Sequence, residues 1–529
     1  MMRRPAAKRS KPRSAQHKAF PAPTKGWIAN ENLAVSTPLG ASVMDNWFPM
    51  ATTVRIRRGS AKWAVIDGLP DVRSLFTYRE GTIEQVFAAT DTDIYDATSP
   101  APGDPPSVGL AHRVMAGMTN GRWISVQFQT SGGTFLRLVN GADVPLVYDG
   151  SSFLTTPAIT GATPESLNFV WQHKNRLWFI EKNSLNAWYL PVDSIGGAAV
   201  KFPLGGVFVL GGRLIAGATW SLDDGGGLSA SCAFFTSEGE VAIYSGSNPA
   251  DAADWQLKGV YRMGKPLGPE AMMRAGGDLV IATDIGFIPL SQCLSRDVAA
   301  LAPIAVSYPI EKAWNDAVAR RASDGNWVVE VWPTEQMALV CPPVVAGVDN
   351  EVFAVNLRTG AWARFTGFDV LCMVQFANVV MYGGSDGRIV QIETTGQDEG
   401  EPYTGTLVPL FDGMKTPASP KVPVQARATL LSYWTPGENV SVAFDYVMSI
   451  PPVPNPTVTP ANSVWGTSIW GSGIWDVSLT KQTFAQWRSV GGQGYALAPV
   501  VQVSSGNAQP LDAELVQIDV VLEVGDIVS

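Results

Sequence analysis

A strand–turn–strand pattern recurs along most of this chain and limits the folds that it can adopt. Short runs of alternating apolar and polar residues, rich in β-branched and aromatic side chains, are separated by Gly, Asp, Asn and Ser. This alternation predicts β-strands joined by tight turns. After Phe76 the pattern is found in seven stretches: "DTDIYDATS" (91–99), "VPLVYDGSSF" (144–153), "NRLWFIEKNSLNAWYL" (175–190), "EGEVAIYSG" (238–246), "GDLVIATDIGFIPL" (277–290), "NEVFAVNLRTGAWARF" (350–365) and "NVVMYGGSDGRIVQI" (378–392).

The length of this region favours a β-propeller. Roughly 320 residues, at about 40–50 residues for a four-stranded blade, hold six or seven blades. We therefore expect an all-β chain with a degenerate β-propeller of six or seven blades over residues 71–395. Residues 26–70 would supply first strands to the propeller or to a smaller platform domain. Two stacked β-domains are the alternative.

Helix is expected in one place. In "PIEKAWNDAVARRASDG" (309–325), Ile310, Trp314, Ala317 and Val318 share one face, and Gly325 is a stop signal. This helix should pack over the sheets and carry no chemistry.

A second domain is expected after a polar, acidic linker, "TTGQDEGEPYTG" (394–405). Strand-like runs return beyond it, so residues 396–529 are predicted to form a β-sandwich-like domain. Between its strands lies "PPVPNPTVTPANS" (451–463), which has too many prolines to pair inside a sheet. It is either an extended loop that reaches a partner or a rigid connector.

Charge is distributed unevenly along the 529 residues. Residues 1–25 contain eight Lys and Arg and no acidic residue, which leaves 30 basic against 47 acidic residues, a net charge of −17, in the rest. The basic arm is interpreted either as a disordered, solubilising tail that orders only against a neighbour or as a segment that neutralises nucleic-acid phosphates. Its candidate contact residues are Arg3, Arg4, Lys8, Arg9, Lys11 and Arg13.

Catalytic and metal-binding signatures are scarce. The four cysteines, Cys232, Cys293, Cys341 and Cys372, form no CxxC pair and are expected to be small buried hydrophobes. Of the three histidines, His173 in "WQHKNRLWF" is interpreted as a satisfied structural residue. No phosphate-binding glycine loop is present. We therefore predict a protein that is not an enzyme, with no catalytic, cofactor or metal site, no signal peptide and no membrane span.

Three tryptophans are spaced five residues apart in "WGTSIWGSGIWD" (465–476). In a continuous strand, residues five apart point to opposite faces, so Trp465, Trp470 and Trp475 do not form one flat sugar-stacking platform. The intervening glycines instead favour a bent segment. The rings are expected to pack inside the C-terminal domain or against another subunit or partner, with carbohydrate stacking as the remaining alternative.

Four ordered stretches resemble a known family. They are "NENLAVSTPLGASVMDNWFPMATTVRIRRGSAKWA" (30–64), "GEVAIYSGSNPADAADWQLKGVYRMGKPLGPEAMMRAGGDLVIATDIGFIPLS" (239–291), "VNLRTGAWARFTGFDVLCMVQFANVVMYGGSDG" (355–387), and a C-terminal run that includes "QWRSVGGQGYALAPVVQV". Together they resemble the tail nozzle proteins, also called tail tubular or tail hub proteins, of short-tailed bacteriophages. The basic segment 1–25 lies outside the resemblance.

The resemblance implies a virion structural protein, assembled in the cytoplasm of a bacterial host. Its copies, six in the family, would form a ring below the adaptor and portal and hold fibre or tail-tip proteins. Double-stranded DNA would leave through the lumen without sequence-specific binding, and acidic walls keep such a polyanion mobile. A receptor- or glycan-binding propeller, such as a tailspike-like depolymerase, is the main alternative, and a cytoplasmic propeller scaffold is a third.

Overall fold

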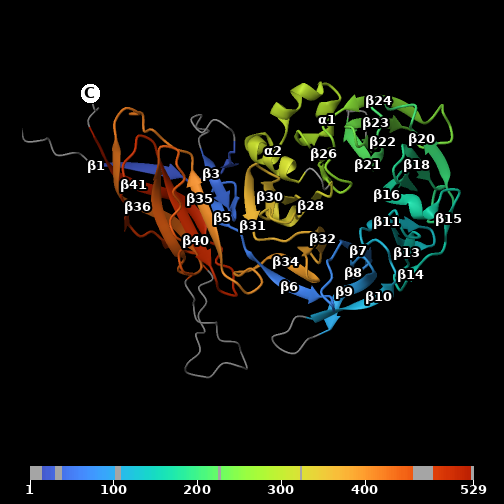
Figure 1. Cartoon of the computed structure of the whole chain (residues 1–529), viewed down its shortest axis with the longest axis horizontal. Coiled ribbons are helices and arrows are strands. Elements are labelled where there is room, and N and C mark those ends of the chain that lie inside the picture. Colours follow the sequence, from blue (N-terminus) through green and yellow to red (C-terminus); the bar gives the residue numbers. More distant parts are fainter. Residues whose placement is uncertain are drawn as a thin grey trace, which may run out of the picture. The chain divides into compact units, whose positions relative to one another are not determined.

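The computed structural model describes residues 15–29, 39–101, 109–223, 228–321, 325–456 and 480–525. Within them the chain divides into two units. One contains residues 59–394, and the other combines the residues before 59 with those from 395 onward. Figure 1 shows the strands of both units, with colours that follow the sequence.

The unit of residues 59–394 is a seven-bladed β-propeller. Blade 1 contains β7 (Ser74–Glu80), β8 (Ile83–Ala89), β9 (Asp93–Ala101) and β10 (Gly109–Ala116). Blade 2 contains β11 (Ile124–Thr130), β12 (Gly133–Val139), β13 (Leu146–Tyr148) and β14 (Phe153–Leu154). Blade 3 contains β16 (Leu167–His173), β17 (Arg176–Glu181), β18 (Asn186–Tyr189) and β20 (Val200–Pro203). Blade 4 contains β21 (Leu214–Asp223), β22 (Leu228–Thr236), β23 (Glu240–Ser245) and β24 (Gln256–Arg262).

The remaining blades complete the ring. Blade 5 contains β25 (Met272–Ala275), β26 (Asp278–Thr283) and β27 (Gly286–Pro289), and blade 6 contains β28 (Val328–Trp332), β29 (Met337–Cys341), β30 (Glu351–Asn356) and β31 (Trp362–Thr366). Blade 7 contains β32 (Cys372–Phe376), β33 (Val379–Gly383) and β34 (Arg388–Thr395), and its fourth strand is β6 (Gly59–Val65). Each blade contacts the next, and β32 of blade 7 lies against β7 of blade 1, so the ring is closed.

Blade 7 is built from both ends of the propeller segment. The blue strand β6 pairs with the orange strand β34 although the rest of the propeller separates them in sequence (Figure 1). This pairing holds the ring shut and leaves neither strand as an open edge on that side. The propeller unit therefore begins at Gly59, ahead of the expected boundary at residue 71.

The seven stretches recognised in the sequence fall one to a blade. In blades 5, 6 and 7 they are the hairpins β26–β27, β30–β31 and β33–β34, and in blade 3 the hairpin β17–β18. Clusters of buried side chains fill the spaces between blades; one of them joins blade 3, blade 4 and blade 5 through Trp178, Phe234 and Ile281. The prediction of an all-β propeller is confirmed, and the number of blades is seven.

The propeller unit also contains two helices, several 3-10 turns and one short two-stranded pair among its described residues. They are the two-stranded pair β15 (Ile159–Thr160) and β19 (Gly197–Ala198), helices α1 (Leu290–Cys293) and α2 (Glu311–Arg320), and the 3-10 turns at Pro164–Ser166, Val298–Ala300, Ala302–Ile304, Tyr308–Ile310 and Pro333–Glu335. The expected helix over 309–325 corresponds to α2 and the turn before it, with Ile310, Trp314 and Ala317 buried. It ends at Arg320, earlier than the expected stop at Gly325. All four cysteines are free thiols and buried, as expected.

The other unit contains two β-sheets. The first has the order β38 (Gln482–Phe484), β36 (Lys421–Ser432), β41 (Glu514–Val524), β5 (Val54–Ile56) and β4 (Trp47–Pro49), with β39 (Arg488–Ser489) paired to β36. The second has the order β2 (Gly26–Trp27), β3 (Gly40–Asp45), β35 (Tyr403–Pro409), β40 (Leu497–Ser505) and β37 (Gly437–Phe444). Strand β36 contacts β37 and β40, so the two sheets face one another as in a sandwich. Residues 39–58 therefore contribute strands to this unit rather than to the propeller.

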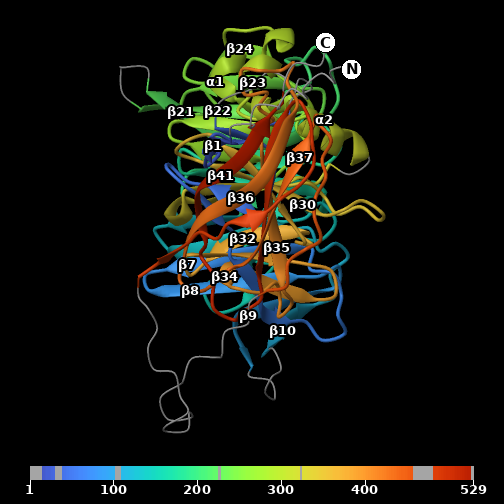
Figure 2. The ribbon, with the colours of Figure 1, turned by 90° about the vertical axis from the view of Figure 1, so that its left-hand side faces the viewer.

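The end of the basic arm is a strand of the same unit. β1 (Ala15–Pro21) pairs antiparallel with β41, as Figure 2 shows beside β36. Phe20 is buried, and Lys18 forms a 2.5 Å ion pair with Asp412. The interpretation of residues 1–25 as a tail that orders only against a neighbour is therefore wrong for residues 15–21, because β41 of the same chain supplies the missing hydrogen-bond partners.

Candidate functional site

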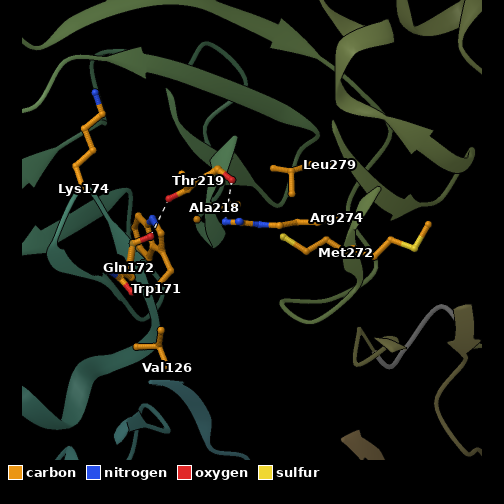
Figure 3. A pocket seen from close by; sticks show the side chains of 11 residues that line it. Val126, Trp171, Gln172, Lys174, Ala218, Thr219, Met272, Arg274 and Leu279 are labelled. Carbon is orange, nitrogen blue, oxygen red and sulfur yellow. Dashed lines mark hydrogen bonds between the residues drawn. The ribbon is translucent and has the colours of Figure 1, made fainter. Parts of the chain in front are cut away.

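The inner strands of four successive blades meet at a pocket in the propeller. Strands β11, β16, β21 and β25 come from blades 2 to 5, and the space between them has a volume of about 560 Å³. That volume is typical of pockets that bind small ligands. The lining residues are Val126, Trp171, Gln172, Lys174, Gly217, Ala218, Thr219, Met272, Met273, Arg274 and Leu279, and Figure 3 shows their side chains.

One wall of the pocket is aromatic and rigid. The ring of Trp171 stacks on Trp178 at a centroid distance of 5.8 Å and meets Phe234 edge to face at 5.7 Å. Gly217 lies directly against this ring, since a Cβ atom there would fall 2.5 Å from the Trp171 side chain. Trp171 therefore closes the pocket on one side but does not offer an open face for stacking a sugar.

Hydrogen bonds fix the polar part of the pocket across the boundary between blades 3 and 4. The Thr219 hydroxyl donates to the backbone carbonyl of Gln172 at 2.8 Å, and His173 Nδ1 lies 3.0 Å from the same hydroxyl oxygen. Because the hydroxyl proton is already used, the Thr219 oxygen accepts from a protonated Nδ1. Burial lowers the pKa of His173 to about 4, so this imidazole is neutral near pH 7. The interpretation of His173 as a satisfied structural histidine is confirmed for Nδ1 but is wrong for Nε2, which is buried and has no hydrogen-bond partner among the described residues.

A guanidinium group is held at the other wall. Arg274, on β25, donates from Nη2 to the backbone carbonyl of Thr219 at 3.2 Å, and Figure 3 shows its side chain reaching from β25 toward Thr219. Arg274 is exposed, and its side chain forms no ion pair with any residue that the structure describes. The guanidinium therefore has further N–H groups that can donate to a ligand in the pocket.

Two further polar side chains border the pocket. The Gln172 side-chain amide is exposed and makes no hydrogen bond to any described residue. Lys174 follows β16 with a φ of +44°, a left-handed conformation that turns the chain into β17. Hydrogen bonds from the backbone amides of Ser247 and Asn248 and from the Ser247 hydroxyl lower the pKa of Asp254, and Lys174 adds the smallest contribution. Arg274 is the cation of the pocket that a hydrogen bond to the Thr219 carbonyl holds in place.

The inner strands of blades 6, 7, 1 and 2 are also linked by polar groups. Gln127 on β11 bonds to both the backbone N–H and the carbonyl of Arg79 on β7, each at 2.8 Å. Arg79 in turn donates to the carbonyl of Gln375 on β32 at 3.2 Å. Burial, and then the neighbouring carboxylate of Glu270, raise the pKa of Glu330 on β28 to about 7, although a hydrogen bond from Gln375 opposes this shift. Side-chain bonds thus connect adjacent blades on this side of the ring as well.

The sequence-predicted site residues are not among these groups. Trp465, Trp470 and Trp475, and the arm residues Arg3, Arg4, Lys8, Arg9, Lys11 and Arg13, lie outside the described residues. Sequence reasoning did not find Arg274, Thr219 or Trp171, because they come from three blades and share no motif. The sequence contains one weak indication of this pocket. In "WQHKNRLWF", the lining residues Trp171, Gln172 and Lys174 lie within two positions of His173.

Among the described residues, no group of three or more His, Cys, Asp or Glu side chains is arranged to hold a metal ion. Over those same residues, no helix is both long and apolar enough to cross a membrane.

The solved structures that are similar to this chain include a β-propeller domain and a set of WD40 repeats. No protein-family model matches the chain, and no curated protein matches its sequence. Among solved structures, the chain is similar to YCF48 bound to D1 peptide, with 8% identity, a TM-score of 0.36, and coverage of 66% of this chain and 95% of that one. It is also similar to the β-propeller domain of Cps50 (Swd1) from Myceliophteria thermophila, with 11% identity, a TM-score of 0.39, and coverage of 64% and 100%. The WD40 repeats of RRP9 match with 11% identity, a TM-score of 0.36, and coverage of 64% and 99%.

Proposed function

We propose that this chain is a virion structural protein that forms the distal tail nozzle of a short-tailed bacteriophage. Several copies assemble as a ring, attach below the adaptor and portal, and conduct double-stranded DNA during ejection. The observation that carries the proposal is the architecture: a β-propeller is inserted into a smaller β-unit made from both ends of the chain. The resemblance to nozzle proteins implies this combination of a propeller and a β platform.

Charge supports the same role. Without the first 25 residues the chain carries a net charge of −17. A basic conduit would release counterions from DNA and bind it tightly, whereas an acidic one repels the phosphates and lets DNA slide. Such a protein needs no catalytic centre.

Exposed apolar side chains support assembly with other subunits. The segment after β37 contains Val447 and Val453, which are 68% and 62% exposed, together with Ile450. β37 is the last strand of its sheet among the described residues, so a ladder edge and an apolar segment lie next to one another. Rings need heterologous contacts, and the cores of such contacts favour apolar and aromatic residues over charges.

Electron microscopy of purified virions labelled with antibodies against this chain tests the proposal. Label at the distal end of a short tail is the expected result. Label on peripheral spikes would instead favour the receptor- or glycan-binding function. Particles that lack this chain should fail to retain or eject DNA, and normal packaging, retention and ejection without it would overturn the nozzle assignment.

The alternative functions predict different results. A tailspike-like depolymerase would bind or cleave host glycans as an isolated protein, and the signal would depend on Trp465, Trp470 or Trp475. A cytoplasmic scaffold would be encoded away from portal and head-completion genes, whereas a nozzle gene should lie beside them.

A further inference from the structure

We infer that the pocket between blades 2 and 5 binds an organic carboxylate that carries an apolar group. The carboxylate is placed on the Arg274 guanidinium, and the apolar group contacts the Trp171, Met272 and Met273 side chains that line the pocket. This site is independent of the nozzle proposal.

Arg274 has the geometry of a carboxylate anchor. One of its donors is engaged by the Thr219 carbonyl, which fixes the direction of the planar guanidinium. Thr219 is itself fixed by its bonds to Gln172 and His173, so the anchor is oriented before a ligand arrives. The remaining donors form a fork that matches the two oxygens of a carboxylate.

The Gln172 amide supplies a second donor near the anchor. Its side chain borders the same pocket and has no hydrogen-bond partner among the described residues. Lys174 adds positive charge at the border, weakened by Asp254. Because much of the remaining lining is apolar, the pocket suits an organic anion better than inorganic phosphate.

The rest of the lining is apolar. Val126, Met272, Met273 and Leu279 contribute aliphatic or thioether surface, and Met side chains adapt to ligands of different shape. A volume of about 560 Å³ holds a ligand larger than a bare inorganic anion. The carboxyl end of a peptide and a medium-chain fatty acid both have this combination of groups.

Calorimetric titrations of the full chain at pH 7.5 and low salt test the inference. The probes are N-acetyl-leucyl-leucine, the same dipeptide as its C-terminal amide, decanoate, and inorganic phosphate. At least one of the two acids should bind, and the dipeptide acid should bind at least tenfold more tightly than its amide if the source is a peptide end. Preference for decanoate identifies a lipid-derived acid. Measurable binding of the dipeptide acid that is no tighter than that of its amide, no binding of either acid, or binding of phosphate alone overturns the inference.

Substitutions test whether the ligand binds in this pocket. Arg274→Gln should weaken binding of the preferred acid at least tenfold, while Arg274→Lys keeps part of it, since the charge remains but the fork is lost. Arg358→Gln removes an exposed arginine on the turn between β30 and β31 and is the matched control, with unchanged affinity expected. Circular dichroism should show that all three variants are folded. If Arg274→Gln and Arg358→Gln bind as the parent does, the pocket is not the site. A failure here leaves the virion-labelling result untouched.

Discussion

His173 Nδ1 lies 3.0 Å from the hydroxyl of Thr219, and this bond connects the inner strands of blades 3 and 4. The imidazole is buried and meets Trp255 edge to face at 5.7 Å. A neutral ring fits these surroundings, because a protonated one would carry a charge into an apolar site. The same bond orders Thr219, whose carbonyl positions Arg274.

The pH dependence of stability should show this buried histidine. The pKa of His173 is about 4 in the folded chain, against 6.5 for an ordinary histidine, so the unfolded chain binds more protons between these values. Stability from this group is therefore full above pH 6.5 and falls as the pH drops toward 4, by at most about 3 kcal/mol. Urea unfolding at pH 7.5 and 5.0 measures it. The loss should be smaller in His173→Gln, and an identical loss in both proteins would contradict the assignment.

Glu330 should change the stability of the folded chain with pH in the opposite direction to His173. Its folded pKa of about 7 exceeds the ordinary 4.5, so the folded chain holds the extra proton. This contribution is present below pH 4.5 and is lost as the pH rises through 7. Glu330→Gln should therefore stabilise the chain at pH 8 relative to the parent, by at most about 3 kcal/mol, and give no gain at pH 4.5. Denaturant midpoints at the two pH values decide it.

Gly217 should not tolerate a side chain. A Cβ atom there would lie 2.5 Å from the ring of Trp171, which Trp178 and Phe234 hold in place. Gly217→Ala should cost about 1–3 kcal/mol of unfolding free energy, typical of overpacking. Gly205→Ala is the control, because a Cβ atom at Gly205 meets nothing within 4 Å. Similar midpoints for the two variants in urea would show that the ring moves aside.

The ion pair between Arg57 and Asp398 should stabilise the sandwich unit against unfolding. Arg57 bonds to both carboxylate oxygens of Asp398, lies 4.3 Å above the ring of Tyr403, and its side chain is inaccessible to solvent. Asp398→Asn leaves this cation without its charge partner and should cost about 3–5 kcal/mol. Asp316→Asn breaks an exposed pair with Lys312 and should cost less than about 0.5 kcal/mol. Equal effects of both substitutions on thermal unfolding would contradict the difference.

Pairing of β1 with β41 should protect the peptide bond after Lys18 from trypsin. Trypsin cuts after Lys18 only when β1 detaches from β41, and the buried Phe20 opposes that opening. Phe20→Ala should therefore increase the rate at which the fragment starting at Ala19 appears, about tenfold or more, as followed by mass spectrometry. Ala15→Gly, at the exposed start of the strand, is the control and should change the rate little. A rate unaffected by Phe20→Ala would show that the strand is held by its ladder alone.

The strands themselves were determined by local sequence. Alternation in "GDLVIATDIGFIPL" and "NVVMYGGSDGRIVQI" predicts hairpins that the structure contains as β26–β27 and β33–β34, because side-chain period and turn chemistry depend only on near neighbours. The helix over 309–325 and the structural histidine His173 were predictable for the same reason. The all-β class and the propeller followed from repetition of that local pattern.

The closure of the fold was decided by tertiary structure. β6 joins blade 7 by pairing with β34, and β1 pairs with β41 from the opposite end of the chain. Edge pairing of this kind depends on which ladder edges the folded chain leaves open, and no local pattern specifies it. The pocket has the same origin: Trp171, Thr219 and Arg274 are ordinary residues in three strands, and only the curvature of the ring places them around one space.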